Sequence, residues 1–329
     1  MKLTLEQIKE VTTGAADVTY NDEKYQFYRF NSDEMAYLSH AFKFATAGVQ
    51  MKFRTDGKML KLKVAARKAL PTRSYFAFDV FVNGAMVGSI QNFCDEECVG
   101  DYANKEYPLG SFEGEFELGE GEKSVRIVFP HSLVAEVEEV VIEDSTYVAP
   151  NKYDKTIIFY GDSITQGFDS LHPSRTYASK LAETLGMDVS NRSIGGAGFS
   201  AGFAQIPRNE KADCLVVAYG TNDWGGYDLE TLKNNTKGFL QGIKTNYPGV
   251  PVYVITPLWR SDWEMTKKGG TFWENFDVIK GTFENEENMT VIPGFDLIPH
   301  DTNLFGDLWL HPNEKGFEYF ADNLVKYFS

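Results

Sequence analysis

The chain has 329 residues and a formal net charge of −15, and its apolar and charged fractions, 43% and 24%, are typical of a globular protein with a large core. Such an acidic surface repels nucleic acids and anionic membranes, so neither is expected as a partner. There is no apolar run of about 18 residues and no apolar segment near the start. The sequence therefore predicts no transmembrane helix and no secretory signal, and it favours a cytoplasmic protein.

The three cysteines predict neither a disulfide framework nor a zinc site. Cys94 and Cys98 lie close together in the sequence, but no second pair of metal ligands accompanies them. Cys214 opens an apolar run and is interpreted as a core residue.

Residues 1–150 are predicted to form an all-β domain after a short helix over 5–11. Apolar and polar residues alternate in a series of short segments. These segments are 24–30, 49–54, 59–65, 75–82, 85–90, 112–118, 124–129 and 134–142. Asn83-Gly84 and the glycine-rich stretch 119–122 predict two hairpins. About eight strands with little helix favour an antiparallel sandwich of jelly-roll type. His40 and His131 stand apart from other reactive side chains and are interpreted as structural.

From residue 151 onward, strand-like apolar runs alternate with helical patterns. The strand-like runs are 156–160, 188–190, 214–219, 252–256 and 290–292, and the helical patterns include 177–185, 229–247, 272–283 and 317–328. This alternation predicts a parallel sheet that is covered by helices on both faces. The loops at the carboxyl ends of its strands then meet at one edge, where such folds bind ligands.

Four loops at this predicted edge carry reactive side chains. Ser163 follows the first strand at the start of a helix, where it is either a nucleophile or an ordinary turn residue. His311 precedes the last helix, where it is either the base that such a serine needs or a loop residue. The N–H of Ser163, the Asn222 amide and an N–H of the glycine-rich loop 195–198 are candidate oxyanion donors. That loop does not match the spacing of the standard nucleotide fingerprints, which argues against a phosphate site.

In this order, the four loops resemble the blocks of the SGNH (GDSL-type) hydrolase superfamily. The matching segments are Gly161-Asp162-Ser163-Ile164-Thr165, Gly220-Thr221-Asn222-Asp223 and His311-Pro312-Asn313. In the remaining block, Gly196 stands where the family has its oxyanion glycine, and Gly195 is the alternative. The resemblance covers about residues 154–329.

The resemblance implies a flavodoxin-like three-layer α/β/α fold and ester hydrolysis without a cofactor or a metal. Ser163 would be the nucleophile and His311 the base. The oxyanion hole would consist of Ser163, Gly196 and Asn222.

The acid behind the histidine departs from the family pattern. The family usually places it three residues before the histidine, and Leu308 occupies that position here. Asp307 lies one residue earlier. Either the loop bulges so that Asp307 orients His311, or a backbone carbonyl does so and a Ser–His dyad operates.

A jelly-roll-like domain ahead of an SGNH domain is similar to the arrangement in certain carbohydrate esterases that remove acetyl groups. This similarity implies an accessory domain over 1–150, a catalytic domain over 151–329, and a small-molecule or oligosaccharide ester as substrate. Trp224, Trp259 and Trp263 follow strands at the predicted edge, where they either stack on sugar rings or pack against the wall.

Two alternatives stay open. One is another SGNH hydrolase, such as a lysophospholipase, a thioesterase or an arylesterase. The other is a non-catalytic carbohydrate-binding protein that keeps the fold. The sequence determines neither the sugar nor the hydroxyl position nor the acyl chain, and it is compatible with a monomer or an oligomer.

Overall fold

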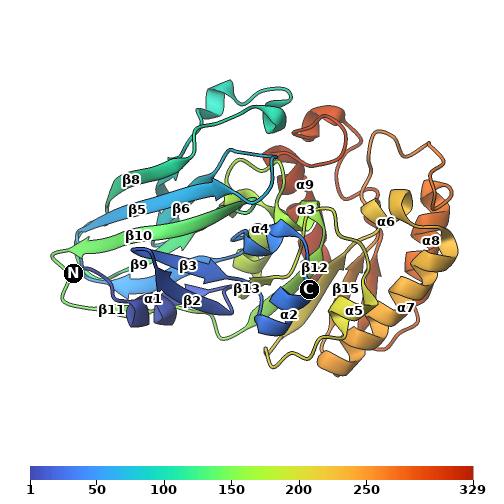
Figure 1. The fold of residues 1–329 in the computed structure, drawn as a ribbon, viewed down its shortest axis with the longest axis horizontal. Coiled ribbons are helices and arrows are strands. Elements are labelled where there is room, and N and C mark those ends of the chain that lie inside the picture. Colours follow the sequence, from blue (N-terminus) through green and yellow to red (C-terminus); the bar gives the residue numbers. More distant parts are fainter. Residues whose placement is uncertain (329) are drawn as a thin grey trace.

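The computed structural model describes residues 1–328, which form two parts that lie side by side (Figure 1). Strands up to residue 150 form antiparallel sheets, and strands from residue 156 onward form a parallel sheet. In the described part of the chain, no helix is both long and apolar enough to cross a membrane.

The N-terminal part contains two antiparallel sheets that enclose one apolar core. The first sheet has the order β1 (Thr12–Thr13), β4 (Gln50–Thr55), β9 (Lys123–Val128), β6 (Ala77–Val82) and β7 (Ala85–Gln91), with β11 (Val148–Pro150) beside β4. The second has the order β2 (Asp17–Asn21), β3 (Lys24–Tyr28), β10 (Leu133–Glu143), β5 (Met59–Lys68) and β8 (Gly110–Glu117). The helices of this part are α1 (Leu5–Val11) and α2 (Ser32–Tyr37). The predicted β-rich antiparallel character is confirmed.

Alternating apolar side chains give each of these sheets one buried face. Val49, Met51 and Phe53 are fully buried and face the core from the first sheet, as predicted. Leu62 and Val64 face the same core from the second sheet.

Of the two predicted hairpins, one is confirmed and one is wrong. Asn83 and Gly84 have φ angles of 50° and 83° and join β6 to β7. β8 instead pairs with β5 in the second sheet, whereas β9 lies between β4 and β6 in the first. The chain crosses between the sheets after β8, so Phe116 and Ile127 reach the shared core from opposite sheets.

The C-terminal part is built on a five-stranded parallel sheet, as predicted. Its order is β13 (Asp188–Asn191), β12 (Thr156–Gly161), β14 (Cys214–Ala218), β15 (Val252–Ile255) and β16 (Met289–Ile292). In chain order this is 2-1-3-4-5, the order of flavodoxin-like sheets. Such sheets bind ligands at the carboxyl ends of the first and third strands, which are β12 and β14 here.

Helices cover both faces of this sheet and give a three-layer arrangement (Figure 1). α4 (Tyr177–Leu185) and α9 (Glu314–Leu324) lie on one face, and α5 (Ala201–Ala204), α7 (Leu229–Asn246) and α8 (Phe272–Phe283) lie on the other. Successive residues of β12 point to opposite layers, because Ile157 and Phe159 pack toward α4 and α9 whereas Ile158 and Tyr160 pack toward α7. The short helices α3 (Ser163–Gln166) and α6 (Thr221–Gly226) follow β12 and β14.

Short 3-10 helices complete the secondary structure. They are Ala41–Phe44, Asp95–Glu97, Tyr102–Asn104, Pro173–Arg175, Thr302–Leu304 and Val325–Phe328.

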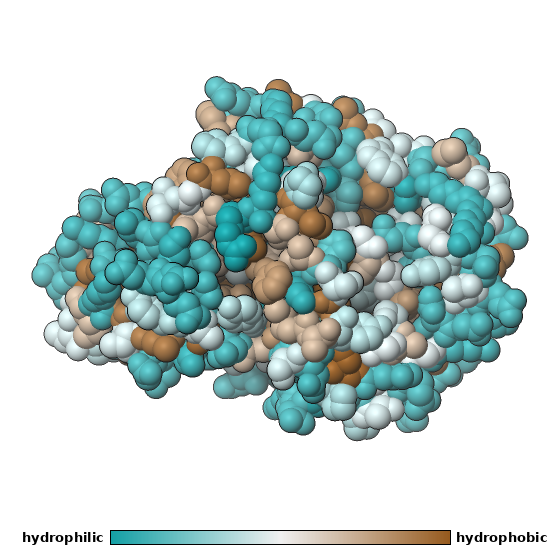
Figure 2. Space-filling model, viewed as in Figure 1, coloured by the Kyte–Doolittle hydropathy of each residue, from teal (hydrophilic) through white to brown (hydrophobic). Residues whose placement is uncertain are grey.

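The two parts share a hydrophobic core. Phe30 and Phe42 of the N-terminal part belong to the same apolar cluster as Phe203 and Phe239 of the C-terminal part. The ring centroids of Phe30 and Phe203 are 6.1 Å apart. In Figure 2, hydrophilic residues cover most of the visible face of the N-terminal sheets, and apolar residues gather near the middle of the molecule.

A buried guanidinium also joins the two parts. Arg29 donates hydrogen bonds of 2.6–3.0 Å to the carbonyl oxygens of Phe42 and Ala45. It also donates to those of Asn191, the last residue of β13, and of Ser193 in the loop that follows. Burial removes water from the Arg29 guanidinium and lowers its pKa to about 9. The four carbonyl oxygens provide the hydrogen bonds that water would otherwise provide.

Glu34, in α2, lies between two buried arginines of the C-terminal part. Its carboxylate is 3.0 Å from Nη1 of Arg192 and 2.9 Å from Nε of Arg208. The sequence analysis missed both α2 and β2. A capping box starts α2, because the side chains of Asn31 and Glu34 each accept the backbone N–H of the other.

Glu34→Gln is expected to lower the free energy of unfolding by about 3–5 kcal/mol, because it leaves two buried guanidinium groups without their shared carboxylate. Urea unfolding followed by circular dichroism measures the change. The control is Glu286→Gln, which removes a more exposed ion pair with Lys244 and should cost less than about 1 kcal/mol. Equal losses in the two variants would contradict the role of the buried network.

Candidate active site

Ser163 lies at the carboxyl end of β12, where the chain turns into α3. Asp162 caps this helix, and its Oδ1 accepts the N–H of Ile164 at 2.9 Å. The turn requires glycine at position 161, because a Cβ there would lie 2.1 Å from Oγ1 of Thr165. This close packing fixes the backbone from which the Ser163 hydroxyl projects.

His311 reaches Ser163 from the loop that precedes α9. Its Nε2 is 2.7 Å from Oγ of Ser163. The two residues are only 8% and 5% exposed, so the hydrogen bond is shielded from bulk water. The ring of Phe168 lies beside the imidazole, with 5.6 Å between the centroids. The structure thus brings the predicted nucleophile and base within proton-transfer distance.

Asp307 contacts His311 although it stands four residues before it. Its Oδ2 is 2.6 Å from Nδ1 of His311, and its Oδ1 accepts the backbone N–H groups of Trp309, Leu310 and His311 at 2.8–3.1 Å. Leu308 has a φ of 64°, and this left-handed residue accommodates the extra position. Burial alone would raise the pKa of Asp307, but the hydrogen bonds from His311 and the backbone lower it to about 2.

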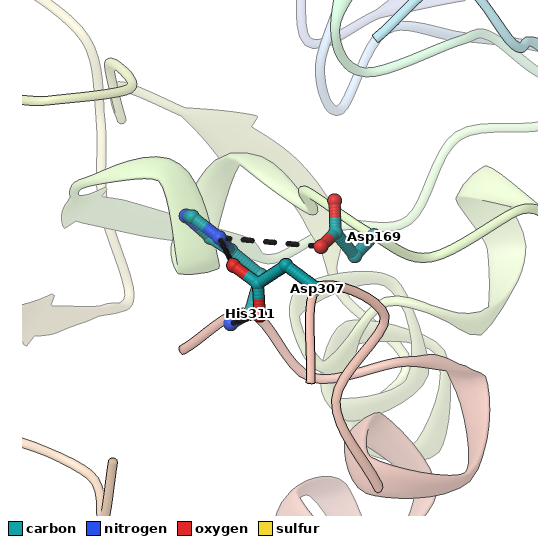
Figure 3. A group of neighbouring side chains, drawn as sticks. All are labelled: Asp169, Asp307 and His311. Carbon is teal, nitrogen blue, oxygen red and sulfur yellow. Dashed lines mark hydrogen bonds and ion pairs between the residues drawn. The ribbon is translucent and has the colours of Figure 1, made fainter. Parts of the chain in front are cut away.

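A second carboxylate and a guanidinium also face the imidazole, and the sequence analysis missed both. Oδ2 of Asp169 is 4.0 Å from Nδ1 of His311 (Figure 3). Nη2 of Arg73 is 3.2 Å from the same nitrogen and 3.9 Å from Oδ2 of Asp307. Asp169, Asp307 and His311 are close enough to hold a metal ion, but the Arg73 guanidinium already places a positive charge among them. No local motif marks Arg73, which lies far away in the sequence between β5 and β6.

The glycine loop offers two neighbouring N–H groups in different situations. The N–H of Gly195 donates to Oε1 of Gln166 at 2.7 Å and is therefore already engaged. Gly196 has a φ of 81°, and its N–H has no hydrogen-bond partner within residues 1–328. Of the two glycines, Gly196 is thus the one whose N–H is available to a ligand.

Asn222 is the second residue of α6, the short helix that follows β14. Its Nδ2 donates to the carbonyl of Ala197 at 2.9 Å, which leaves its second amide hydrogen for a ligand. This bond links the loop after β14 to the glycine loop. Ser163, Gly196 and Asn222 therefore stand on three loops at the same edge of the sheet.

Two acids of the predicted blocks are buried behind this edge. Burial raises the pKa of Asp162 to about 7 and that of Asp223 to about 6. Oδ1 of Asp223 accepts the N–H of Phe199 at 3.0 Å, and among the described residues its Oδ2 has no partner. Asp223 thereby braces the glycine loop from within.

The predicted tryptophans are mostly packing residues in this structure. Trp224 is fully buried and donates its indole N–H to the carbonyl of Gly270 at 2.9 Å, so it presents no face to a sugar. Trp259 is buried and stacks on His300, with the centroids 5.4 Å apart. Trp263 is half-buried within a cluster of other aromatic rings.

Trp309, which the sequence analysis did not select, is the aromatic side chain exposed next to His311. It is 39% exposed, and the guanidinium of Arg260 lies 4.8 Å from its ring centroid. In the sequence, only its position two residues before His311 indicates that Trp309 lies near the site. The position of a residue in a loop does not show whether its side chain faces solvent.

Comparison with known proteins identifies the C-terminal part. Residues 159–319 match the model of the GDSL-like lipase/acylhydrolase family. This part of the chain is a GDSL-like lipase/acylhydrolase domain. All four predicted blocks, from Ser163 to His311, lie within the matched segment of this GDSL-like domain.

Solved structures share the arrangement of both parts. A salicylyl-acyltransferase from a tetracycline biosynthetic pathway has a TM-score of 0.79 and 22% identity, over 95% of this chain and 92% of that one. A family two carbohydrate esterase from Cellvibrio japonicus has a TM-score of 0.65 and 16% identity, over 98% and 95%. An acetyl xylan esterase from Butyrivibrio proteoclasticus has a TM-score of 0.60 and 16% identity, over 99% and 97%. These likenesses show the fold. A comparison with curated protein sequences found no match.

Asp162→Asn is expected to stabilise the GDSL-like domain by about 4 kcal/mol at pH 8. Because the pKa of Asp162 is about 7 when folded, against roughly 4 for an unfolded aspartate, the folded state is penalised for the ionised carboxylate at high pH. The gain should shrink as the pH falls through this window and vanish near its lower end, where both states are protonated. Chemical denaturation at pH 8 and at pH 4.5 measures it.

The control for this prediction is Asp228→Asn, at the exposed N-cap of α7. The backbone N–H of Thr231 lowers the pKa of Asp228, so loss of that charge should not stabilise the protein. If Asp162→Asn gained the same stability at both pH values, the buried charge of Asp162 would not be the cause of the gain.

Proposed function

We propose that the protein is a serine esterase that hydrolyses O-acetyl or other short-acyl esters of carbohydrates. The observation that carries the hydrolase assignment is the chain of hydrogen bonds from Ser163 through His311 to Asp307, inside a GDSL-like domain. In this proposal Ser163 is the nucleophile, His311 the general base and Asp307 the acid that orients it.

The first half of the reaction transfers the acyl group to the enzyme. Oγ of Ser163 attacks the ester carbonyl carbon while its proton moves to Nε2 of His311. The carbonyl oxygen becomes an oxyanion, which the N–H groups of Ser163 and Gly196 and the amide of Asn222 stabilise. His311 then gives its proton to the leaving sugar hydroxyl, and the ester bond to the sugar breaks.

The second half returns the enzyme to its starting state. His311 takes a proton from a water molecule, whose oxygen attacks the acyl carbon and forms a second tetrahedral intermediate. When this intermediate collapses, the proton passes back to Oγ of Ser163 and the carboxylic acid leaves. Throughout, Asp307 keeps the hydrogen on Nδ1 of His311 and stabilises the imidazolium.

The carbohydrate substrate is supported by fold likeness and by the edge of the site. Solved structures with both parts of this fold include an acetyl xylan esterase and family two carbohydrate esterases, one of them in complex with cellohexaose. The exposed ring of Trp309 beside His311 is suited to stack on a sugar. In the same proposal, residues 1–150 form a jelly-roll-like accessory domain and residues 151–329 the catalytic domain.

A second candidate function is transfer of the acyl group to an alcohol instead of water. It is favoured by the fold likeness to a salicylyl-acyltransferase. The acyl-enzyme would be the same, and only the second acceptor would differ. A lysophospholipase, thioesterase or arylesterase would share the serine chemistry as well. The contact between Ser163 and His311 argues against a binding protein without catalysis.

Ser163→Ala is expected to reduce kcat for acetate release from acetylated xylo-, manno- or cello-oligosaccharides by about 10⁴-fold or more, because no other group can form the acyl-enzyme. Parallel assays with nitrophenyl esters of increasing chain length test the other esterases, and added alcohol acceptors test acyl transfer. The control is Ser179→Ala, which removes an equally buried hydroxyl from α4 and should retain activity. Full activity in Ser163→Ala would overturn the assignment of Ser163 as nucleophile. Faster cleavage of nitrophenyl esters with long acyl chains would contradict the carbohydrate substrate and favour one of the other esterases.

Asp307→Asn is expected to lower kcat by about 10²–10⁴-fold, because an amide at this place does not hold the required imidazole tautomer or stabilise the imidazolium. The control is Asp301→Asn, at an exposed cap in the same loop region. Activity close to wild type in Asp307→Asn would show that the enzyme works as a Ser–His dyad.

A further inference from the structure

Arg73 reaches the candidate site from the N-terminal part. It binds the carboxylate of Asp169 through two nitrogens, with Nε 2.9 Å from Oδ1 and Nη2 3.3 Å from Oδ2. The Asp169 side chain is fully buried, and that of Arg73 is 12% exposed. Such a two-pronged contact fixes both the position and the orientation of the two groups.

The surrounding contacts hold this pair in a defined place. The hydroxyl of Tyr75 lies 3.3 Å from Oδ1 of Asp169 and accepts the Asp169 N–H at 2.9 Å. Tyr102 donates its hydroxyl to the carbonyl oxygen of Asp169. The guanidinium carbon of Arg73 lies 5.0 Å from the ring centroid of Phe168. Arg73 and Asp169 have φ angles of 36° and 69°, a conformation that such residues rarely adopt unless packing enforces it.

The pair lies directly against Nδ1 of His311. That nitrogen has Asp307 at 2.6 Å, the Arg73 guanidinium at 3.2 Å and the Asp169 carboxylate at 4.0 Å. Figure 3 shows that the two carboxylates approach the imidazole from different segments of the chain. Arg73 thus contacts both of the carboxylates that face the same imidazole nitrogen.

We propose that Arg73 and Asp169 are positioning residues for the esterase: the guanidinium holds Asp169 away from His311 and balances its charge, so that Asp307 alone orients the imidazole. This inference rests on the proposed function of Ser163 and His311. It assigns to the N-terminal part a direct role in the catalytic site through Arg73.

The two charges act on His311 in opposite directions. The Asp169 carboxylate favours the protonated imidazole, which cannot serve as a base, whereas the Arg73 guanidinium opposes protonation. Asp162 and Asp307 also carry acidic groups near this imidazole, and the hydroxyls of Tyr75 and Tyr102 contact Asp169. None of these groups is itself replaced in the Arg73 and Asp169 variants, and the double variant restores the balance of charge beside them.

The test measures kcat/KM for acetate release against pH in Arg73→Met, Asp169→Asn and the double variant. In Arg73→Met the acid limb of the profile should move up by about one pH unit, because the unbalanced carboxylate retains the proton on His311. In Asp169→Asn it should move down by about one unit, because the unbalanced guanidinium expels that proton. In the double variant it should return to the wild-type position.

Two further variants separate charge from packing. Arg73→Lys keeps the positive charge and should leave the acid limb near its wild-type position. Arg126→Met removes another arginine that pairs across the two parts, with Glu183, and whose side chain is 14% exposed. It should leave the acid limb unchanged, because Arg126 does not contact His311.

Losses that are equal at every pH, or shifts in the same direction for both single variants, would overturn the proposal. Thermal unfolding checks that each variant is folded, and if Arg73→Met is not, the downward shift in Asp169→Asn decides. The ¹⁵N signals of the His311 ring, titrated without substrate, should show the same displacements. The ¹⁵N signals of His311 could shift in opposite directions in Arg73→Met and Asp169→Asn while Ser163→Ala keeps its activity. That result would support the charge balance and contradict the proposed function.

Discussion

Several buried contacts join the two halves of the fold, and the position of the glycine loop depends on one of them, the guanidinium of Arg29. It binds carbonyl groups of its own part and those of Asn191 and Ser193, at the end of β13 and in the loop that leads to Gly196. A charge with so little access to water tolerates few arrangements other than the observed one, because each donor requires its acceptor. The glycine loop is thus held from outside the sheet by Arg29 and from within by Asp223. The position of the glycine loop is therefore determined by residues of both halves.

Much of the architecture could be predicted from local patterns. Buried strands of the parallel sheet read as short apolar runs, and the Asn83-Gly84 turn has a backbone requirement that few other residue pairs meet. The failed hairpin after β8 shows the limit of this approach. A glycine-rich turn tells where the chain reverses but not which strand it joins, because the partner is chosen by packing of residues such as Phe116 against a shared core.

The candidate site divides in the same way. Ser163, Asn222 and His311 stand in recognisable blocks on loops that the sheet order brings together. Arg73 has no such mark, because its relation to His311 exists only after two segments separated by 238 positions have packed. Trp224 illustrates the opposite error, since it follows the Asn222 block but its ring turns inward to Gly270. Sequence places a residue on a loop, but only packing decides on which side of the loop its side chain lies.

The left-handed residue Leu308 allows a spacing of four between the acid and the histidine without loss of contact. The same conformation directs three successive N–H groups onto one carboxylate oxygen of Asp307 and leaves the other for the imidazole.

The shared contacts also bear on how such proteins can be recombined. Four side chains of the N-terminal part contact residues of the GDSL-like domain: Arg29, Phe30, Phe42 and Arg73. The N-terminal sheets are therefore not an interchangeable module on a self-sufficient hydrolase. A chimera that joins this GDSL-like domain to a different sandwich would inherit the reactive blocks but lose the groups that seat the glycine loop and face the imidazole. Exchange of the N-terminal part between related proteins should therefore succeed only when the segments around residues 29–45 and 73 are kept together with the GDSL-like domain that they contact.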